Sequence, residues 1–234
     1  CLMAAGMASI RAQKESYVPY EPVYITITAE GGEIGGVPLV PLEYDVSEFS
    51  VQVLRPNGQK TVFRPPMRLQ PALPSCRLAQ SEVTACLLMS NGRPVTREPG
   101  EYRIALTRTV GGELVSNMAT FPVIAPASEA DQQALGLIEQ SPMEYCWFVY
   151  LNGGDHLEDG LVMCRTLAEG KSSYAPICRT VLAINYSCPS YDIAKRKLRR
   201  QREPALVERY FPTQFGALQE SQLRTLATRV RREM

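Results

Sequence analysis

The sequence predicts a β-sandwich followed by an α-helical region, in two domains of about 7–125 and 126–234. Short segments that alternate apolar and polar residues run from about 7 to 124, divided by Gly, Pro and Asn turns. After the Pro/Ala junction at 122–127, the apolar spacing becomes that of amphipathic helices. A chain of 234 residues with 45% hydrophobic content is long enough for one large or two small domains.

About seven short strands fill the first domain. Asn57-Gly58 favours the positive φ angles of a tight hairpin turn between the third and fourth strands. A second turn, Val110-Gly111-Gly112, joins the last two strands. The expected strands are 8–13, 23–28, 49–54, 60–63, 83–89, 102–109 and 113–123.

Two short segments of this domain resemble sequence motifs of a known protein family. The segment 17–24, YVPYEPVY, resembles the entry of macroglobulin-type and related extracellular immunoglobulin-like domains. The segment 98–102, EPGEY, resembles the "P-G-x-Y" opening of a late strand in the same domains. The resemblance covers roughly the first 125 residues and implies an immunoglobulin-like sandwich in which Tyr102 points inward and anchors its hydroxyl to the preceding corner. It implies a fold and no reaction, because such domains serve adhesion, spacing and recognition alike.

The second domain is expected to begin with a helix capped by Ser128, with Asp131 completing the capping box and Pro142 closing the helix. Two further helices, 157–168 and 174–186, form an αα-hairpin about the turn at 170–172.

The helix start at 173–176, SYAP, weakly resembles those of tetratricopeptide-like arrays. The segment 210–215 is a candidate degenerate second copy. The resemblance implies stacked helical hairpins.

The cysteines favour disulfides and an oxidising compartment. With Cys1 set aside, the number in the body of the chain is even. Unpaired buried thiols are the alternative, and zinc is disfavoured because no cysteine pair has CxxC spacing and the chain has one histidine. We therefore expect no metal or other cofactor. The disulfide candidates are Cys76, Cys86, Cys146, Cys164, Cys178 and Cys188.

The expected pairings are Cys76–Cys86, Cys164–Cys178 and Cys146–Cys188. Cys178 and Cys188 lie about 15 Å apart along or just past one helix, too far for a disulfide. Cys164 and Cys178 lie at equal distances from the hairpin turn and so face each other across it.

Cys1 is a lipidation candidate. Its context, CLMAAG, fits the first residue of a mature bacterial lipoprotein, the end of a signal peptide's apolar core, or a fragment of a longer chain. The first two interpretations imply export, so the expected location is secreted, periplasmic or on the cell surface.

His156 is the only histidine and follows Asp155 directly. A histidine among carboxylates can act as a general base or a metal ligand. The structural alternative, which we favour, makes Asp155 the N-cap of the following helix. A thiol enzyme would pair His156 with Cys146 or Cys164. The sequence contains no Gly-x-Ser-x-Gly, phosphate-binding glycine loop or HExxH motif, and we expect no catalytic residues.

The densest charge run is 195–202, KRKLRRQR, in a segment from Cys188 onward with eleven basic and five acidic residues. We expect a solvated basic helix face, with docking on the acidic remainder or on an anionic surface as its possible uses. Nucleic acid is excluded because no aromatic residues interleave with the charges. No apolar run approaches the roughly 20 residues of a membrane-spanning helix.

Taken together, these features predict a non-catalytic exported binding or structural module whose partner is an unknown protein or glycan at a cell surface. The alternatives are a cysteine-dependent enzyme centred on His156 and an inhibitor or adhesion module of macroglobulin-like type.

Overall fold

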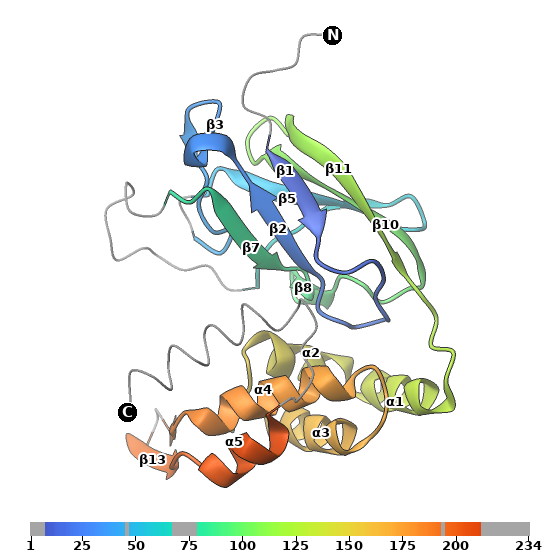
Figure 1. The fold of residues 1–234 in the computed structure, drawn as a ribbon, viewed down its shortest axis with the longest axis vertical. Coiled ribbons are helices and arrows are strands. Elements are labelled where there is room, and N and C mark those ends of the chain that lie inside the picture. The colour runs from blue at the N-terminus through green and yellow to red at the C-terminus, as the bar shows by residue number, and fades with distance from the viewer. Residues whose placement is uncertain (1–7, 45–46, 67–78, 193–194, 212–234) are drawn as a thin grey trace. The chain divides into compact units, whose positions relative to one another are not determined.

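The protein combines strands and helices (Figure 1), and its computed structural model describes residues 8–44, 47–66, 79–192 and 195–211. Backbone contacts divide the chain into two compact units, residues 1–125 and 126–234. The described strands all lie in the first unit except for one small hairpin, and the five described α-helices all lie in the second.

The first unit contains two main antiparallel sheets. One has the order β1-β2-β7 and the other the order β11-β10-β5-β6. All seven stretches expected from alternation form strands, with ends that shift by a few residues. The first sheet comprises β1 (Ser9–Ala12), β2 (Tyr24–Thr28) and β7 (Glu82–Cys86), and the second comprises β5 (Phe49–Leu54), β6 (Lys60–Val62), β10 (Gly100–Arg108) and β11 (Leu114–Val123).

Smaller elements lie between these strands. They are the 3-10 helix η1 (Glu30–Gly32) and two short strand pairs. The pairs are β3 (Glu33–Ile34) with β4 (Val37–Pro38), and β8 (Met89–Ser90) with β9 (Arg93–Pro94).

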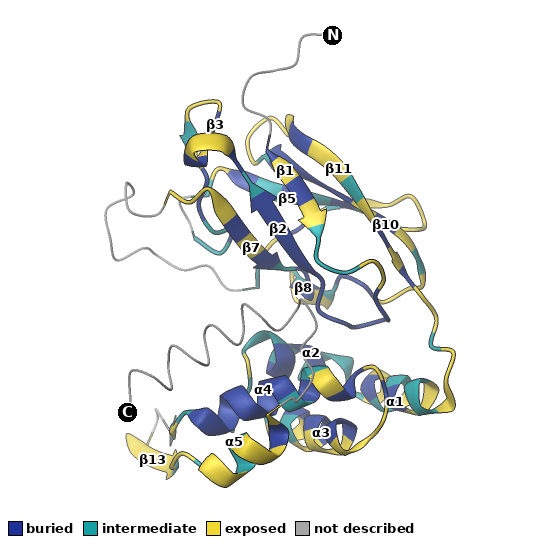
Figure 2. Ribbon diagram, viewed as in Figure 1, coloured by how far each residue is buried: buried dark blue, intermediate teal, exposed yellow. Residues whose placement is uncertain are grey.

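One hydrophobic core joins the inward residues of both main sheets (Figure 2). In β5 the side chains of Phe49, Val51 and Val53 are buried, whereas Ser50, Gln52 and Leu54 between them are partly exposed. This alternation is the period of two that a half-buried strand requires. The polar residues of β5 therefore lie on the outer face of the four-stranded sheet.

The hairpin expected at Asn57-Gly58 joins β5 to β6, but only Gly58 has a positive φ, of 81°. The Gly58 amide donates to the Arg55 carbonyl at 2.9 Å, and the Arg55 amide donates to the Gln59 carbonyl at 2.9 Å. This is a three-residue loop that ends in a left-handed glycine. The prediction of a positive φ at Asn57 is wrong. The Asn57 side chain accepts a hydrogen bond from the Gln59 amide at 2.9 Å and so stabilises the turn without a left-handed backbone at this residue.

The segment 17–24 has a structural role in the loop that joins β1 to β2. Tyr17 is buried and meets Phe121 edge to face, with ring centroids 5.3 Å apart. Its hydroxyl accepts from the Lys14 amide at 3.0 Å. Glu21, 3% exposed, pairs with the Lys14 ammonium group and accepts from the Val18 amide at 3.0 Å. These contacts stabilise the loop between β1 and β2.

The first unit should lose stability in alkali because burial raises the pKa of Tyr17 to about 12. The neutral phenol is favoured in the folded state, so this contribution is complete below pH ~10 and is lost as the pH rises towards 12. We expect the free energy of unfolding to fall between these values by about 2–3 kcal/mol more in the wild type than in Tyr17→Phe. Urea unfolding at a series of pH values measures this difference. If the free energy of unfolding falls equally with pH in the wild type and in Tyr17→Phe, the prediction is contradicted.

The second unit contains five α-helices and a small hairpin. Ser128 caps α1 as expected, because its hydroxyl accepts from the Asp131 amide at 3.0 Å. The expected αα-hairpin is also confirmed, with Gly170 at the turn. The elements are α1 (Glu129–Gln140), α2 (Pro142–Tyr150), α3 (Glu158–Glu169), α4 (Ala175–Ser187), β12 (Ser190–Asp192), β13 (Lys197–Arg200) and α5 (Pro204–Tyr210).

Pro142 does more than close α1, because it also begins α2 as a first-turn proline. The sequence does not reveal α2, because the helix is apolar on most sides and has no amphipathic period. It packs closely on α3: a Cβ at Gly160 would lie 2.6 Å from the Glu144 carbonyl oxygen.

The expectation that the basic run forms a helix is wrong. Lys197–Arg200 form β13, which pairs with β12 after a turn that contains Arg196 at φ 49°. The strand is held by Arg200, which reaches Asp155, 45 positions away in the sequence. Such a long-range contact overrides local helix propensity.

Tyr210 ends α5, but residues 212–215 lie outside the described residues. The tetratricopeptide-like repeat therefore stays a prediction.

Candidate functional site

The outer face of the four-stranded sheet brings together residues from four separate stretches of sequence. Strand register places Met118 beside Ala105, Ala105 beside Gln52, and Gln52 beside Val62. Thr107 lies beside Ser50 in the neighbouring row. The polar residues Ser50, Gln52 and Thr107 share this face with buried Ala105 and with the exposed apolar side chains of Val62, Leu114 and Met118.

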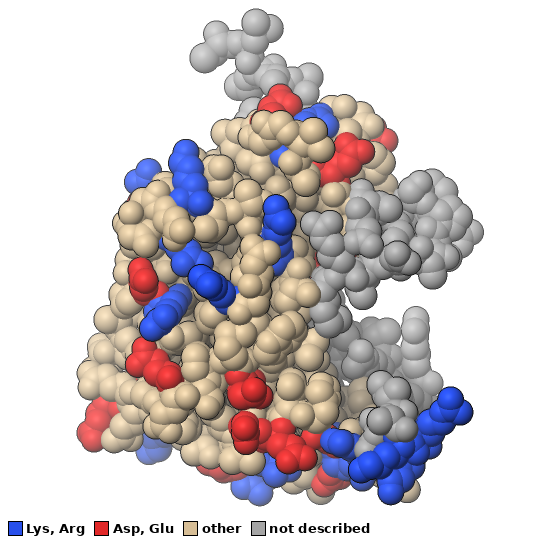
Figure 3. Space-filling view, turned by 180° about the vertical axis from the view of Figure 1, so that it is seen from behind, with Lys and Arg blue, Asp and Glu red and all other residues tan. Residues whose placement is uncertain are grey.

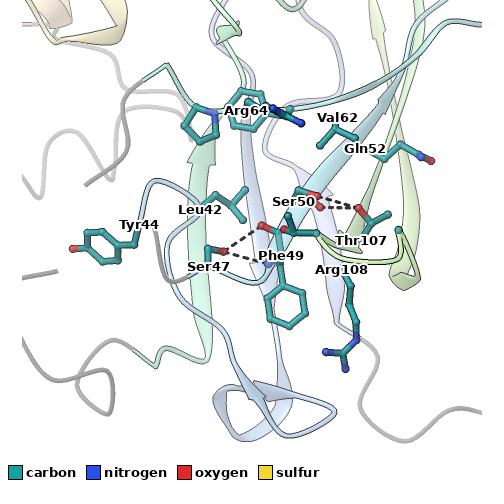
Figure 4. Close-up of a pocket in the computed structure, with 14 residues that line it drawn as sticks. Leu42, Tyr44, Ser47, Phe49, Ser50, Gln52, Val62, Arg64, Thr107 and Arg108 are labelled. Atoms are coloured by element: carbon teal, nitrogen blue, oxygen red, sulfur yellow. Dashed lines mark hydrogen bonds between the residues drawn. The ribbon is translucent and has the colours of Figure 1, made fainter. Parts of the chain in front are cut away.

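A hollow of about 280 Å³ opens over the start of β5 and the end of β10 (Figure 4). The Ser50 and Thr107 hydroxyls lie 3.3 Å apart on adjacent strands, and the Thr107 hydroxyl also donates to the Ser50 carbonyl at 3.2 Å. The lining residues are Leu42, Tyr44, Ser47, Phe49, Ser50, Gln52, Val62, Phe63, Arg64, Pro65, Thr107, Arg108, Thr109 and Gly112.

Two arginines give the hollow a positive character. The Arg108 guanidinium lies 5.9 Å from the centre of the Phe49 ring and pairs with Glu113 at 3.2 Å. Arg64 follows β6, and its backbone amide donates to the Ser90 hydroxyl at 2.9 Å. The Arg64 side chain is exposed and forms no ion pair with any residue that the structure describes. Arg64 is therefore the lining cation that can pair with a ligand.

A β-bulge lies next to the hollow. The register of β10 on β11 shifts between Ala105 and Thr107, and the Ser116 hydroxyl accepts from the Leu106 amide at 2.8 Å in place of a ladder carbonyl. The bulge also lets the Asn117 side chain bond both backbone groups of Ile10, at 2.8 and 3.1 Å. Bulges bend a strand and re-aim its side chains, and they are frequent beside binding sites.

The described lining residues set the chemistry of the hollow. Among the described residues that line the hollow, none is Asp, Glu, His, Cys or Lys. General acid–base chemistry commonly needs such a group within hydrogen-bond reach of the substrate. The hydroxyls, the amide and the guanidinium of this hollow supply hydrogen bonds and positive charge instead.

The structure does not place Asp155 at a helix N-cap. The N-cap of α3 is Leu157, and Asp155 is instead held by Arg200, whose Nε and Nη2 donate to the two carboxylate oxygens at 2.9 and 3.2 Å. Asn185 donates to Asp155 as well, at 3.3 Å. Burial raises the pKa of this carboxyl, but the hydrogen bonds and charge of Arg200 together with its other donors bring the pKa below the ordinary value. Asp155 therefore joins β13 to the loop before α3.

His156 differs in exposure from the two cysteines that a thiol enzyme would pair with it. His156 is exposed, whereas Cys146 and Cys164 are fully buried. Burial and the neighbouring Cys178 thiol raise the pKa of Cys164 well above its usual range, but a nucleophilic cysteine needs a lowered pKa. Among the described residues, no cluster of three or more His, Cys, Asp or Glu side chains has the arrangement of a metal site.

In the structure the described cysteines are thiols: Cys86, Cys146, Cys164, Cys178 and Cys188. Cys164 and Cys178 are both buried, and the Cys178 thiol lies near enough to Cys164 to raise the pKa of Cys164. All three expected pairings stay predictions about the oxidised protein. Cys1 and Cys76 lie outside the described residues, so neither lipidation nor the Cys76–Cys86 pairing can be placed on the structure.

A comparison with models of known protein families found no match, and a search of curated proteins found no relative. In the described part of the chain, no helix has the length and apolar character needed to cross a bilayer. The hollow was not identified from the sequence. Its one local signal is the pair of outward polar positions, Ser50 and Gln52, in the alternating strand β5.

Proposed function

We propose that the protein is a non-catalytic binding module whose N-terminal unit is an immunoglobulin-like β-sandwich that binds a carboxylate-bearing glycan in the hollow on its four-stranded sheet. The strand orders β1-β2-β7 and β11-β10-β5-β6 and the single core shared by both sheets support the sandwich. The Tyr102 hydroxyl, which donates to the Glu98 carbonyl at 3.0 Å, supports the resemblance to immunoglobulin-like domains.

The observation that carries the ligand class is the lining of the hollow. Arg64 has no carboxylate partner among the described residues, and the hydroxyls of Ser50 and Thr107 and the amide of Gln52 line the same hollow. Guanidinium groups bind carboxylates by charge-assisted hydrogen bonds, and hydroxyls and amides bind the hydroxyls of sugars. The volume of about 280 Å³ lies near the lower end of ligand sites and suits one sugar unit.

The buried thiols and the exposed His156 support a non-catalytic module over a cysteine-dependent enzyme. An acidic glycan is a cell-surface ligand, which agrees with an exported protein. An adhesion module of macroglobulin-like type is compatible with the same site, whereas an inhibitor would need a protein surface as its partner.

Isothermal titration of the full chain with sodium glucuronate and with glucose tests the proposal. We expect glucuronate to bind and glucose to bind at least tenfold more weakly, because a charge-assisted hydrogen bond contributes about 1.5–3 kcal/mol. Arg64→Ala should remove this preference, and the matched exposed variant Arg93→Ala should keep it. Equal binding of the two sugars, or unchanged glucuronate binding by Arg64→Ala, would contradict the proposal.

A further inference from the structure

The β12–β13 hairpin and the residues that follow it carry the most concentrated positive charge of the chain. Residues 195–202 contain six basic residues and no acidic one. All of these basic side chains are exposed except that of Arg200. Figure 3 shows basic side chains gathered at one end of the helical unit. The basic run is thus displayed on a hairpin instead of a helix face.

Arg200 fixes this hairpin to the helical unit. Besides its two hydrogen bonds to Asp155, its Nη2 donates to the Asn185 carbonyl at 2.9 Å. Its guanidinium also lies 4.8 Å from the centre of the buried Tyr186 ring. A two-stranded hairpin is marginally stable alone. The contacts of Arg200 therefore hold the other cations in place on the surface.

Two cations of the hairpin have no counter-charge among the side chains that the structure describes. Asp155 and Glu203 both pair with Arg200, at 2.9 and 3.6 Å. The exposed side chains of Arg196 and Lys197 form no ion pair with any side chain that the structure describes. Because like charges repel, this arrangement reduces stability, and such local conflicts are expected mainly at functional sites.

Leu198 distinguishes between a membrane surface and a soluble polyanion as the binding partner of the basic residues. It lies within this basic run and is 42% exposed. At a membrane surface, cations bind the headgroups while a neighbouring apolar side chain enters the boundary with the acyl chains. A soluble polyanion gains little from such a leucine. We propose that the β12–β13 hairpin binds the surface of an anionic phospholipid bilayer, a site separate from the hollow of the first unit.

Flotation of the full chain with vesicles tests this proposal. We expect binding to phosphatidylcholine vesicles that contain about 30% phosphatidylglycerol, weaker binding as the salt concentration rises, and no binding to pure phosphatidylcholine. Each cation near such a surface contributes a factor of about five, so the double variant Arg196→Gln/Lys197→Gln should bind about 30-fold more weakly. The matched double variant Arg93→Gln/Arg97→Gln, which neutralises two exposed arginines of the first unit, should bind like the wild type.

Leu198→Ser separates a bilayer from a soluble polyanion. We expect this variant to bind anionic vesicles more weakly and to keep the same affinity for heparin as the wild type. Unchanged vesicle binding by Leu198→Ser, together with tighter binding of heparin than of vesicles, would overturn the proposal in favour of a polyanion. Binding to neutral vesicles, equal losses in both double variants, or no binding to anionic vesicles would overturn it as well. Circular dichroism of each variant checks that it is folded.

Discussion

Tyr102→Ala should lower the free energy of unfolding of the first unit by about 3–5 kcal/mol, as expected for truncation of a buried aromatic residue. Tyr102 is 1% exposed, and its ring stacks on Phe121 with centroids 5.7 Å apart and planes 7° from parallel. Alanine would leave a cavity between the two sheets and remove the hydrogen bond to the Glu98 carbonyl.

Tyr102→Phe is the matched control for this prediction. It keeps the ring in the core and removes only the hydroxyl, so we expect a loss of about 1 kcal/mol. Urea unfolding followed by circular dichroism measures both variants. If alanine costs no more than phenylalanine, Tyr102 does not anchor the core of a sandwich.

Asp155→Ala should destabilise the second unit by about 2–4 kcal/mol, because it leaves the Arg200 guanidinium without its closest carboxylate. The two side chains are only 14% and 16% exposed, so water compensates the lost contact poorly. A lost helix cap would cost about 1 kcal/mol and would not depend on Arg200. A double-mutant cycle with Arg200→Met distinguishes the two roles, since only the ion pair gives a large coupling energy.

The pH dependence of this ion pair has a definite sign. The pKa of Asp155 in the folded protein lies below its ordinary value of 3.8. Its contribution to stability is therefore complete at neutral pH and is lost as the pH falls below about 4 and through the folded pKa. The wild type should lose more stability in this range than Asp155→Asn. If the free energy of unfolding falls equally with pH in the wild type and in Asp155→Asn, the ion pair does not contribute to stability as predicted.

The strands could be predicted because each main strand buries one face. In β5 the buried Phe49, Val51 and Val53 alternate with partly exposed residues, and this period is visible in the sequence itself. Helix α2 could not be predicted, because its apolar residues surround it and leave no period. The strand formed by the basic run could not be predicted either. It depends on the contact between Arg200 and Asp155, which no local sequence pattern shows.

The hollow could not be predicted for a similar reason. Ser50 and Thr107 are 57 positions apart in the sequence and meet only through the register of β5 on β10. The bulge that lets Ser116 accept a backbone hydrogen bond depends on the register of β10 on β11 and has no sequence signature. By contrast, the cap formed by Ser128 and the corner hydrogen bond of Tyr102 each join residues no more than four positions apart, and both were predicted.

The most direct test of glycan binding in the hollow is an NMR titration of the isotopically labelled full chain with sodium glucuronate. Amide shifts should be confined to the start of β5, the end of β10 and the residues around Arg64, and they should disappear in Arg64→Ala while the rest of the spectrum is unchanged. Shifts that appear only in the helical unit, or no shifts at millimolar glucuronate, would contradict binding in the hollow.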